Sequence, residues 1–344
     1  MHEAIGHADA QGTRPLTLDS VFSIFSVTKA FTNALVYRAV ERGQLAFTAK
    51  VSSVIPEFSG GLREHITFYH LLTHSSGLPA VFSPIPGRDT CIDRLDEVVA
   101  AICEHVHTDM PPNERVTYAP LVAHALMGEA VRRVDPRKRS YRQLLEDEIL
   151  RPLGLKDTAV GVRADLRSRH VVPHFLSEMP FKHLGHSNLG PNGAFEEEFA
   201  EMPWVGCIST VPDLHRYAEM LRNGGALEGT RILSPALIEQ ATLNRTGDKV
   251  NELYAALARA RGWTPYPAYI GIGFLLRGDA ICHHQFGTLT SPRTFGHQGA
   301  GSALFWIDPE IDMTFVCLTA GVLDEGDNVE RFQRLSDLVV SAAE

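Results

Sequence analysis

The fold is decided by residues 22–32, which read FSIFSVTKAFT. An apolar stretch typical of a strand ends here, and apolar residues at steps of three and four then continue to Leu45, with Gly43 as a stop signal. This pattern predicts a short strand followed by a long amphipathic helix. Ser26 and Lys29, which form the only Ser-x-x-Lys of the chain, lie where that helix begins.

Ser26 and Lys29 share one face of the predicted helix, because they are three residues apart. A lysine amine that burial keeps neutral can accept the proton of a serine hydroxyl, and backbone N–H groups at a helix N-terminus can stabilise an oxyanion. The pair therefore fits a nucleophile beside its base. A four-residue pattern is short, so a second interpretation is a helix-capping serine beside a lysine whose amine reaches solvent.

Length and composition favour a globular enzyme. The 344 residues are 44% hydrophobic and 21% charged, which allows a sizeable core. A net charge of -9 with scattered basic residues argues against a nucleic-acid partner. No apolar run approaches the roughly 18 residues of a membrane span, and the first residues, MHEAIGH, lack the basic start of an export signal. We therefore expect a cytoplasmic protein that does not bind membranes. The sequence does not indicate its oligomeric state.

Five cysteines are widely spaced and odd in number, which predicts reduced thiols rather than disulfides or a zinc framework. Among the histidines, the best metal candidate is the segment 105–109, and the segments 183–186 and 283–284 are weaker. None has the two histidines four residues apart with a glutamate that a helical zinc site uses. We expect no metal and no cofactor. The cysteines are Cys91, Cys103, Cys207, Cys282 and Cys317.

The order of predicted elements indicates a mixed α/β chain of the α+β type. The simplest arrangement is an antiparallel sheet built from both chain ends and flanked by helices, with a mostly helical inserted domain. On this division, 1–45 and 205–344 form the sheet domain and 46–204 the helical domain, with the active site at their interface. The patterns predict helices over 95–105, 121–134, 141–150, 214–221 and 328–343, and strands over 269–276, 301–307 and 313–318.

The chain resembles the serine beta-lactamase-like hydrolases. It is nearer to class C beta-lactamases, D-aminopeptidases and the carboxylesterases of the same fold than to class A enzymes. The resemblance covers nearly the whole chain and implies a beta-lactamase/transpeptidase-like fold. It rests on five blocks in the same order: FSVTK at 25–29, ITFYHLLTHSSGLP at 66–79, EILRPLGLKDT at 148–158, ISTVPDL at 208–214 and FGHQGAG at 295–301.

By this resemblance, Ser26 matches the nucleophile and Lys29 its adjacent amine. Tyr118 matches the second family motif and would relay protons as a phenol or a phenolate. A phenol has an ordinary pKa near 10, so it would need neighbouring positive charge, which Lys29 and His297 could supply. The block containing His74 matches a structural part of the family.

The third family motif falls on His297, Gln298 and Gly299, at a sheet edge. Here the resemblance implies that Gly299 allows the substrate backbone to approach closely. The N–H groups of Ala300 and Ser26 would together form the oxyanion hole.

Two departures from the family pattern bear on the substrate. Pro120 stands where lactam-cleaving members have an asparagine whose amide binds the lysine and the substrate, and proline offers no side-chain donor. The stretch Gln298-Gly299-Ala300 lacks the hydroxyl groups that hold a penicillin carboxylate.

A third departure is at the start of the chain. Members usually have a helix and a strand before the segment that begins here at Glu3, so the recorded start is late or the sheet edge is trimmed.

These observations predict a serine hydrolase that acts through an acyl-enzyme on a small ester or amide, as carboxylesterases of this family do. The close alternative is an acyltransferase that moves the acyl group from Ser26 to an amine or alcohol acceptor. A beta-lactamase or D-amino-acid peptidase is less favoured, and a non-catalytic binding homologue is least favoured.

Overall fold

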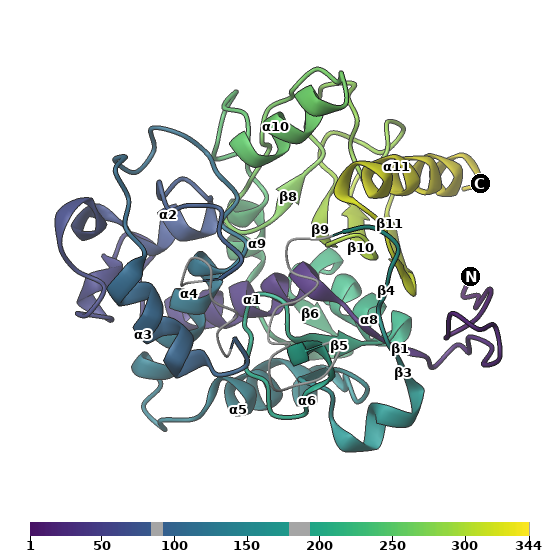
Figure 1. The fold of residues 1–344 in the computed structure, drawn as a ribbon, viewed down its shortest axis with the longest axis horizontal. Helices are drawn as coiled ribbons and strands as arrows, with labels where there is room; N and C mark the ends of the chain where they lie inside the picture. Colours follow the sequence, from purple (N-terminus) through teal and green to yellow (C-terminus); the bar gives the residue numbers. More distant parts are fainter. Residues whose placement is uncertain (84–91, 179–192, 344) are drawn as a thin grey trace.

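The structure, a computed structural model, describes residues 1–83, 92–178 and 193–343. Helices and several small sheets are intermixed, as predicted (Figure 1). Helices occupy α1 (Thr28–Glu41), α2 (Phe68–Leu72), α3 (Leu95–His105), α4 (Val122–Val134), α5 (Tyr141–Leu145), α6 (Arg151–Leu153), α8 (Val211–Arg222), α9 (Pro235–Ala241), α10 (Glu252–Ala260) and α11 (Glu325–Ser341). Strands occupy β1 (Val21–Ser23), β2 (Ala159–Val160), β3 (His170–Val171), β4 (His174–Phe175), β5 (Cys207–Ser209), β6 (Ala226–Leu227), β7 (Thr230–Arg231), β8 (Leu275–Leu276), β9 (Phe295–Gly299), β10 (Ala303–Asp308), β11 (Met313–Leu318) and β12 (Gly321–Val322).

The larger of the two four-stranded sheets has the order β11-β10-β9-β8 and is antiparallel throughout. Alternate residues of β10 point to opposite faces, as the pleat of a strand requires. Trp306 packs with Phe332 of α11 on one face and donates a hydrogen bond of 3.0 Å from its indole to Ser336. Phe305 packs against Tyr217 of α8 on the other face, with ring centroids 6.1 Å apart. The sheet is therefore enclosed between α11 and α8 (Figure 1).

Strand β1 does not join this sheet, so the expectation of one sheet built from both chain ends is wrong in that detail. It lies in the second sheet, of order β2-β5-β1-β3. There Phe22 pairs with Ser209 of β5, and Val21 pairs with His170 of β3. The interior strands of this sheet, β5 and β1, are mainly apolar and buried. Both partners of β1, the strands β5 and β3, come from the middle of the chain. The division into two domains stays a prediction.

Helix α1 is buried on all sides, whereas the sequence pattern predicted an amphipathic helix. Eleven of its residues are buried. Its polar side chains are satisfied by protein groups in place of water: the Thr32 hydroxyl donates to the Pro203 carbonyl at 2.6 Å, and the Asn33 amide donates to the Gly273 carbonyl at 2.9 Å. The stop signal is confirmed, because Gly43 adopts a φ of 68° just after the helix ends.

Two other predicted elements match closely, and one does not. The helix at 95–105 and the strand at 313–318 have the predicted bounds. The strand predicted over 269–276 shrinks to Leu275–Leu276. Tyr269 adopts a φ of 46° and Gly273 a φ of 90°, which an extended strand does not contain. Strand β9 was not predicted from its pattern.

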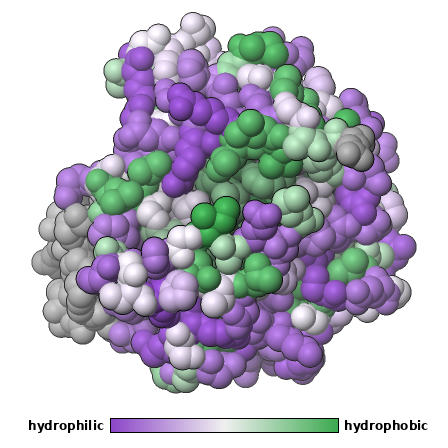
Figure 2. Space-filling view, turned by 90° about the vertical axis from the view of Figure 1, so that its right-hand side faces the viewer, coloured by the Kyte–Doolittle hydropathy of each residue, from purple (hydrophilic) through white to green (hydrophobic). Residues whose placement is uncertain are grey.

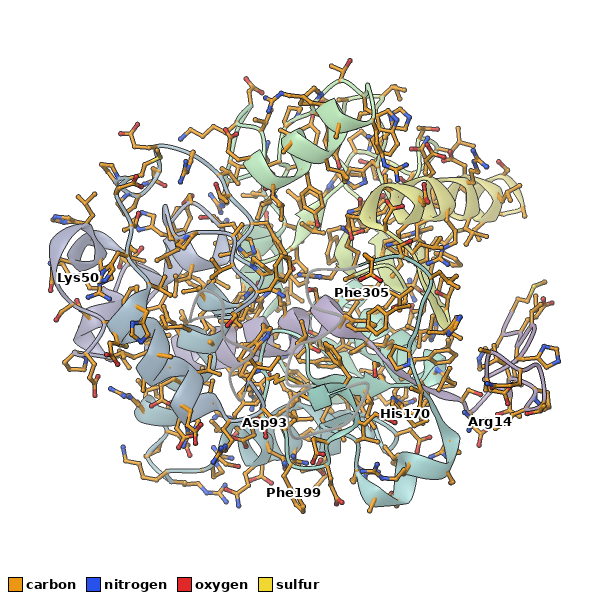
Figure 3. The ribbon with its side chains drawn as sticks, viewed as in Figure 1. Arg14, Lys50, Asp93, His170, Phe199 and Phe305 are labelled. Carbon is orange, nitrogen blue, oxygen red and sulfur yellow. The ribbon has the colours of Figure 1, made fainter. Side chains whose placement is uncertain are left out.

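The N-terminal segment is fixed to the smaller sheet by Arg14. Its guanidinium donates to the carbonyl of His170 at 2.8 Å and to that of Ser168 at 3.0 Å. Figure 3 shows Arg14 on this segment at the margin of the molecule, with His170 beside the sheet that it joins. The His170 ring lies 3.1 Å from the Ser23 hydroxyl, three residues before Ser26, so the segment supports the strand that leads into the site.

Strand β11 ends the larger sheet, and all six of its residues are half-buried. Figure 2 faces the side of the molecule on which β11 and α11 lie in Figure 1, and hydrophobic side chains gather near the middle of that face.

None of the described helices combines the length and the apolar character needed to cross a membrane. The four described cysteines are free thiols, and Cys91 lies outside the described residues.

Candidate active site

Ser26 lies in a single 3-10 turn, Phe25–Val27, between β1 and α1. Phe25 precedes it with a φ of 44°, in the left-handed region that non-glycine residues rarely adopt. The first residue of α1 is capped by Val27 without a side-chain hydrogen bond, so Ser26 is not a helix cap. Lys29 is fully buried and its amine does not reach solvent. Both findings contradict the capping interpretation of the pair.

The Lys29 amine is held between two oxygen atoms. Its Nζ lies 2.9 Å from Ser26 Oγ and donates to the Trp204 carbonyl at 2.8 Å. Neither partner is a carboxylate, and burial lowers the pKa of Lys29 well below its usual 10.5. An amine without its extra proton keeps a lone pair, which can accept the Ser26 proton.

Tyr118 completes the cluster from the loop before α4. Its ring centroid lies 5.2 Å from Lys29 Nζ, and its backbone N–H donates to the Asn251 side chain at 3.1 Å. Burial raises the pKa of Tyr118 above its usual 10, a hydrogen bond with Ser26 opposes this, and the nearby Glu325 adds to it. Of the two forms considered from the sequence, these shifts favour the phenol over the phenolate.

His297 lies behind the cluster and carries no charge at neutral pH. Burial, opposed by the hydrogen bond with the Gln298 backbone and assisted by the neighbouring Lys29, lowers its pKa to about 3. The Nδ1 atom lies 2.9 Å from the Gln298 carbonyl. The expectation that His297 supplies positive charge to Tyr118 is therefore wrong, because a buried imidazole without a carboxylate partner stays neutral.

His74 supports the loop that carries Tyr118. It adopts a φ of 52°, its ring centroid lies 4.7 Å from that of Tyr118, and its Nδ1 accepts a hydrogen bond of 3.2 Å from the Ala119 N–H. Burial lowers the pKa of His74 to about 3, so this ring also stays neutral and remains an acceptor.

Strand β9 approaches the Ser26 turn at Gly299. A Cβ on Gly299 would lie 2.2 Å from the carbonyl oxygen of Ile24, so only glycine fits. The close approach seen in the structure is thus to the protein's own backbone, and the close approach of a substrate expected from the resemblance stays a prediction. It brings Ala300, the next residue, to the wall of the cavity that Ser26 also lines. The oxyanion hole formed by the Ser26 and Ala300 N–H groups stays a prediction.

A cavity of about 300 Å³ opens in front of Ser26. Five of the predicted site residues line it, whereas Lys29, His297 and Gly299 lie behind its wall. The wall is mainly apolar and aromatic, as in many small-molecule sites. The described lining residues are Phe25, Ser26, Phe82, Tyr118, Pro120, Leu121, Glu178, Phe195, Trp204, Val205, Leu253, Tyr254, Leu257, Gln298, Ala300, Asp324 and Glu325.

Sequence reasoning missed the polar part of this wall. The Gln298 amide donates to the Tyr254 hydroxyl at 2.9 Å and to Glu325 Oε1 at 2.6 Å. Burial raises the pKa of Glu325 to about 7. The only sequence signal near it is the acidic pair that opens α11, and there Asp324 does serve as the helix cap. Nothing in the sequence relates Tyr254 or Glu325 to the motif at 297–299.

The metal candidates do not converge. Over residues 1–83, 92–178 and 193–343, no group of three or more histidine, cysteine or acidic side chains is arranged to hold a metal ion. His105 lies 3.8 Å from Glu104, and the His283 ring stacks on Trp263 with centroids 4.1 Å apart. The segment 183–186 lies outside the described residues.

Comparisons with known proteins identify the family of the chain. The model of the family described as Beta-lactamase matches residues 1–339. Protein Rv1367c of Mycobacterium tuberculosis is 28% identical over 340 residues, covering 91% of this chain and 80% of that protein. Esterase/beta-lactamase LipL of the same species is 25% identical and covers 90% and 71%. Esterase EstB of Burkholderia gladioli is 25% identical and covers 92% and 81%.

Solved structures show the same fold. A penicillin-binding protein homologue from Caulobacter crescentus superposes with a TM-score of 0.76 at 25% identity, covering 98% of this chain and 88% of that one. A family VIII carboxylesterase superposes with a TM-score of 0.74 at 21% identity, covering 96% and 87%. These likenesses confirm the predicted beta-lactamase/transpeptidase-like fold.

Proposed function

The chain belongs to the beta-lactamase family, and we propose that within this family it is a serine esterase that forms an acyl-enzyme on Ser26. The observation that carries the proposal is the buried Lys29 amine 2.9 Å from Ser26 Oγ, and burial lowers the pKa of that amine well below its usual 10.5. Curated relatives named as esterases, LipL and EstB, support the same activity class.

In the first half-reaction, Ser26 Oγ attacks the ester carbonyl while its proton passes to the Lys29 amine. The tetrahedral intermediate collapses when the bond to the leaving alcohol breaks. The Tyr118 phenol donates a proton to that leaving oxygen and regains one from Lys29, so the cluster returns to its starting charge. Water then attacks the acyl-enzyme by the reverse transfers and releases the acid.

Beta-lactams fit the cavity poorly. Pro120, Gln298 and Ala300 line it and offer no hydroxyl or cation for a lactam's carboxylate. Glu178, Asp324 and Glu325 line the same wall, and the described lining residues include no lysine, arginine or histidine. Two missing charge-assisted hydrogen bonds cost a factor of about 10² to 10⁴ in transition-state binding.

Acyl transfer is the second candidate. The apolar wall, with Phe25, Phe195 and Trp204, can hold an organic alcohol or amine beside the acyl-enzyme while offering few polar groups to orient water. An acceptor bound in this way would compete with hydrolysis for the same intermediate.

The test measures turnover of short-chain 4-nitrophenyl esters, nitrocefin and benzylpenicillin, together with labelling of Ser26 by a fluorophosphonate. We expect turnover of the aryl esters, negligible turnover of both lactams, and label on Ser26. Added alcohols or amines, with products identified by mass spectrometry, measure the share of acyl transfer. Nitrocefin turnover equal to that of the best aryl ester would contradict the esterase assignment, and so would an unlabelled Ser26.

A further inference from the structure

Glu325 places a carboxyl group on the cavity wall, near Tyr118. It is the first residue of α11 and comes directly after the helix cap. Its described hydrogen-bond partners are the Gln298 amide and the Tyr254 hydroxyl, and neither is a cation. Its neighbour Asp324 differs, because that carboxylate is paired with Arg261 at 2.5 Å. Among the described residues, no cation is paired with Glu325, which lies on the wall of a mainly apolar cavity.

The rest of the cavity suits a positive charge. The ionisable lining residues in the described part of the chain are acids or phenols, and burial of the Lys29 amine behind the wall favours its uncharged form. Tyr254 and Tyr118 line the cavity with ring centroids 6.0 Å apart. Aromatic faces attract alkylammonium groups, most strongly where water is excluded.

Gln298 supplies an independent indication of a ligand. Only 4% of it is exposed, and its Oε1 has no hydrogen-bond partner among the described residues although its amide nitrogen has two. A buried acceptor without a donor costs free energy, and such groups in native proteins are usually satisfied by a ligand or by water. An N–H group entering this side of the cavity would meet both Gln298 and Glu325.

We propose that the natural substrate carries a cationic amine, which binds at Glu325 against Tyr254 while its ester or amide carbonyl lies at Ser26. This inference rests on the proposed function and deepens it by naming the substrate class. The amine belongs either to the acyl group or to the leaving alcohol. The alternative is that Glu325 has a purely structural role and only holds Gln298 and Tyr254 in place. The experiment must distinguish this role from cation binding.

The experiment compares substrates with neutral isosteres in which carbon replaces the charged nitrogen. The acyl arm uses the 4-nitrophenyl esters of 4-(dimethylammonio)butanoate, which keeps one N–H, and of its carbon isostere 5-methylhexanoate. The leaving-group arm uses 2-(dimethylammonio)ethyl butyrate and 3-methylbutyl butyrate. In one arm we expect the cationic member to have a kcat/KM about ten-fold to a hundred-fold higher, as one charge-assisted contact provides.

The variant Glu325→Gln should bring that ratio close to one, because the amide keeps the shape and loses the charge. Glu330→Gln, on the same helix outside the cavity wall and next to Arg334, should keep the wild-type ratio. A structural role would lower both members of a pair equally and leave the ratio unchanged, which would overturn the proposal. A ratio near one in both arms of the wild type would overturn it too.

A measurement on the wild type alone covers the case in which Glu325→Gln does not fold. Protonated 2-(dimethylamino)ethanol should slow fluorophosphonate labelling of Ser26 at concentrations at which its neutral isostere 3-methylbutan-1-ol does not. Equal protection by the two would contradict cation binding. If neutral aryl esters are hydrolysed and Ser26 is labelled but no preference for cations appears, the esterase stands and only this inference fails. If neither ester turnover nor labelling occurs, the proposed function itself fails.

Discussion

Two regions around the cavity differ in how burial acts on their ionisable groups. Near Ser26, burial lowers the pKa of Lys29 well below its usual 10.5 and contributes to a pKa of about 3 for His297, which favours the uncharged form of both bases. At the start of α11, burial raises the pKa of Glu325 to about 7. The same physical cause thus favours a proton acceptor in one region and, in the other, a carboxyl that ionises near neutral pH.

The largest expected effect on activity comes from removing the nucleophile. Ser26→Ala should lower ester turnover by about four orders of magnitude while the fold stays intact, because no acyl-enzyme can form. Ser23→Ala is the matched control, since that hydroxyl contacts His170 and not the cavity, and it should keep most of the activity. A Ser26→Ala variant with more than about a tenth of wild-type turnover would show that another group is the nucleophile.

The next largest effects concern the two groups that move protons. Lys29→Ala and Tyr118→Phe should each lower turnover by about 10² to 10⁴, because both contact Ser26. The double variant should lose much less than the product of the single losses, since the two groups act as a unit. Fully multiplicative losses in kcat would mean that they work independently.

The pH dependence of kcat/KM tests which basic group matters. Lys29 acts in its unprotonated form, so the rate should fall as pH drops through the lysine pKa, which lies below its usual 10.5. His297 is already unprotonated above about pH 3 and should not contribute to this limb. His297→Asn should therefore leave the position of the limb unchanged, whatever it does to the plateau. If the limb moved in that variant, His297 would be the base whose protonation limits the rate, contrary to its low pKa.

The smallest expected effect is on stability, on the side of Glu325. A carboxyl whose pKa is raised from 4.5 to about 7 by folding binds its proton more tightly in the native state. The wild type therefore loses stability as pH rises from about 4.5 to about 7, and Glu325→Gln does not. Melting curves should show the variant gaining a few degrees on the wild type between pH 5 and pH 8. A constant difference across that range would show that Glu325 ionises normally.

The reaction centre could be predicted from sequence because its parts are local. Ser26 and Lys29 are three residues apart where α1 begins, and the residues from His297 to Ala300 follow one another at the end of β9. Their electrostatic state could not be predicted, because it depends on burial by segments far away in the chain. The carbonyl that binds the Lys29 amine, for example, belongs to Trp204.

The polar part of the cavity wall, at Gln298, Tyr254 and Glu325, was not predicted for a related reason. Tyr254 and Glu325 begin two separate helices, and only the packing of α10 and α11 brings both to Gln298. Strand pairing shows the same limit. The pattern predicted β11 with its bounds, but the partners of β1 at Ser209 and His170 are tertiary information that periodicity does not contain.

The proposed mechanism requires that the acyl group of the substrate becomes attached to Ser26. Acid-quenching the enzyme during turnover of 4-nitrophenyl butyrate, followed by mapping of the modified peptide by mass spectrometry, detects this intermediate. We expect a butyryl group on Ser26, which accumulates in a burst and disappears when the substrate is exhausted. A butyryl group on a different residue, or steady turnover with Ser26 unmodified and no loss on Ser26→Ala, would contradict it.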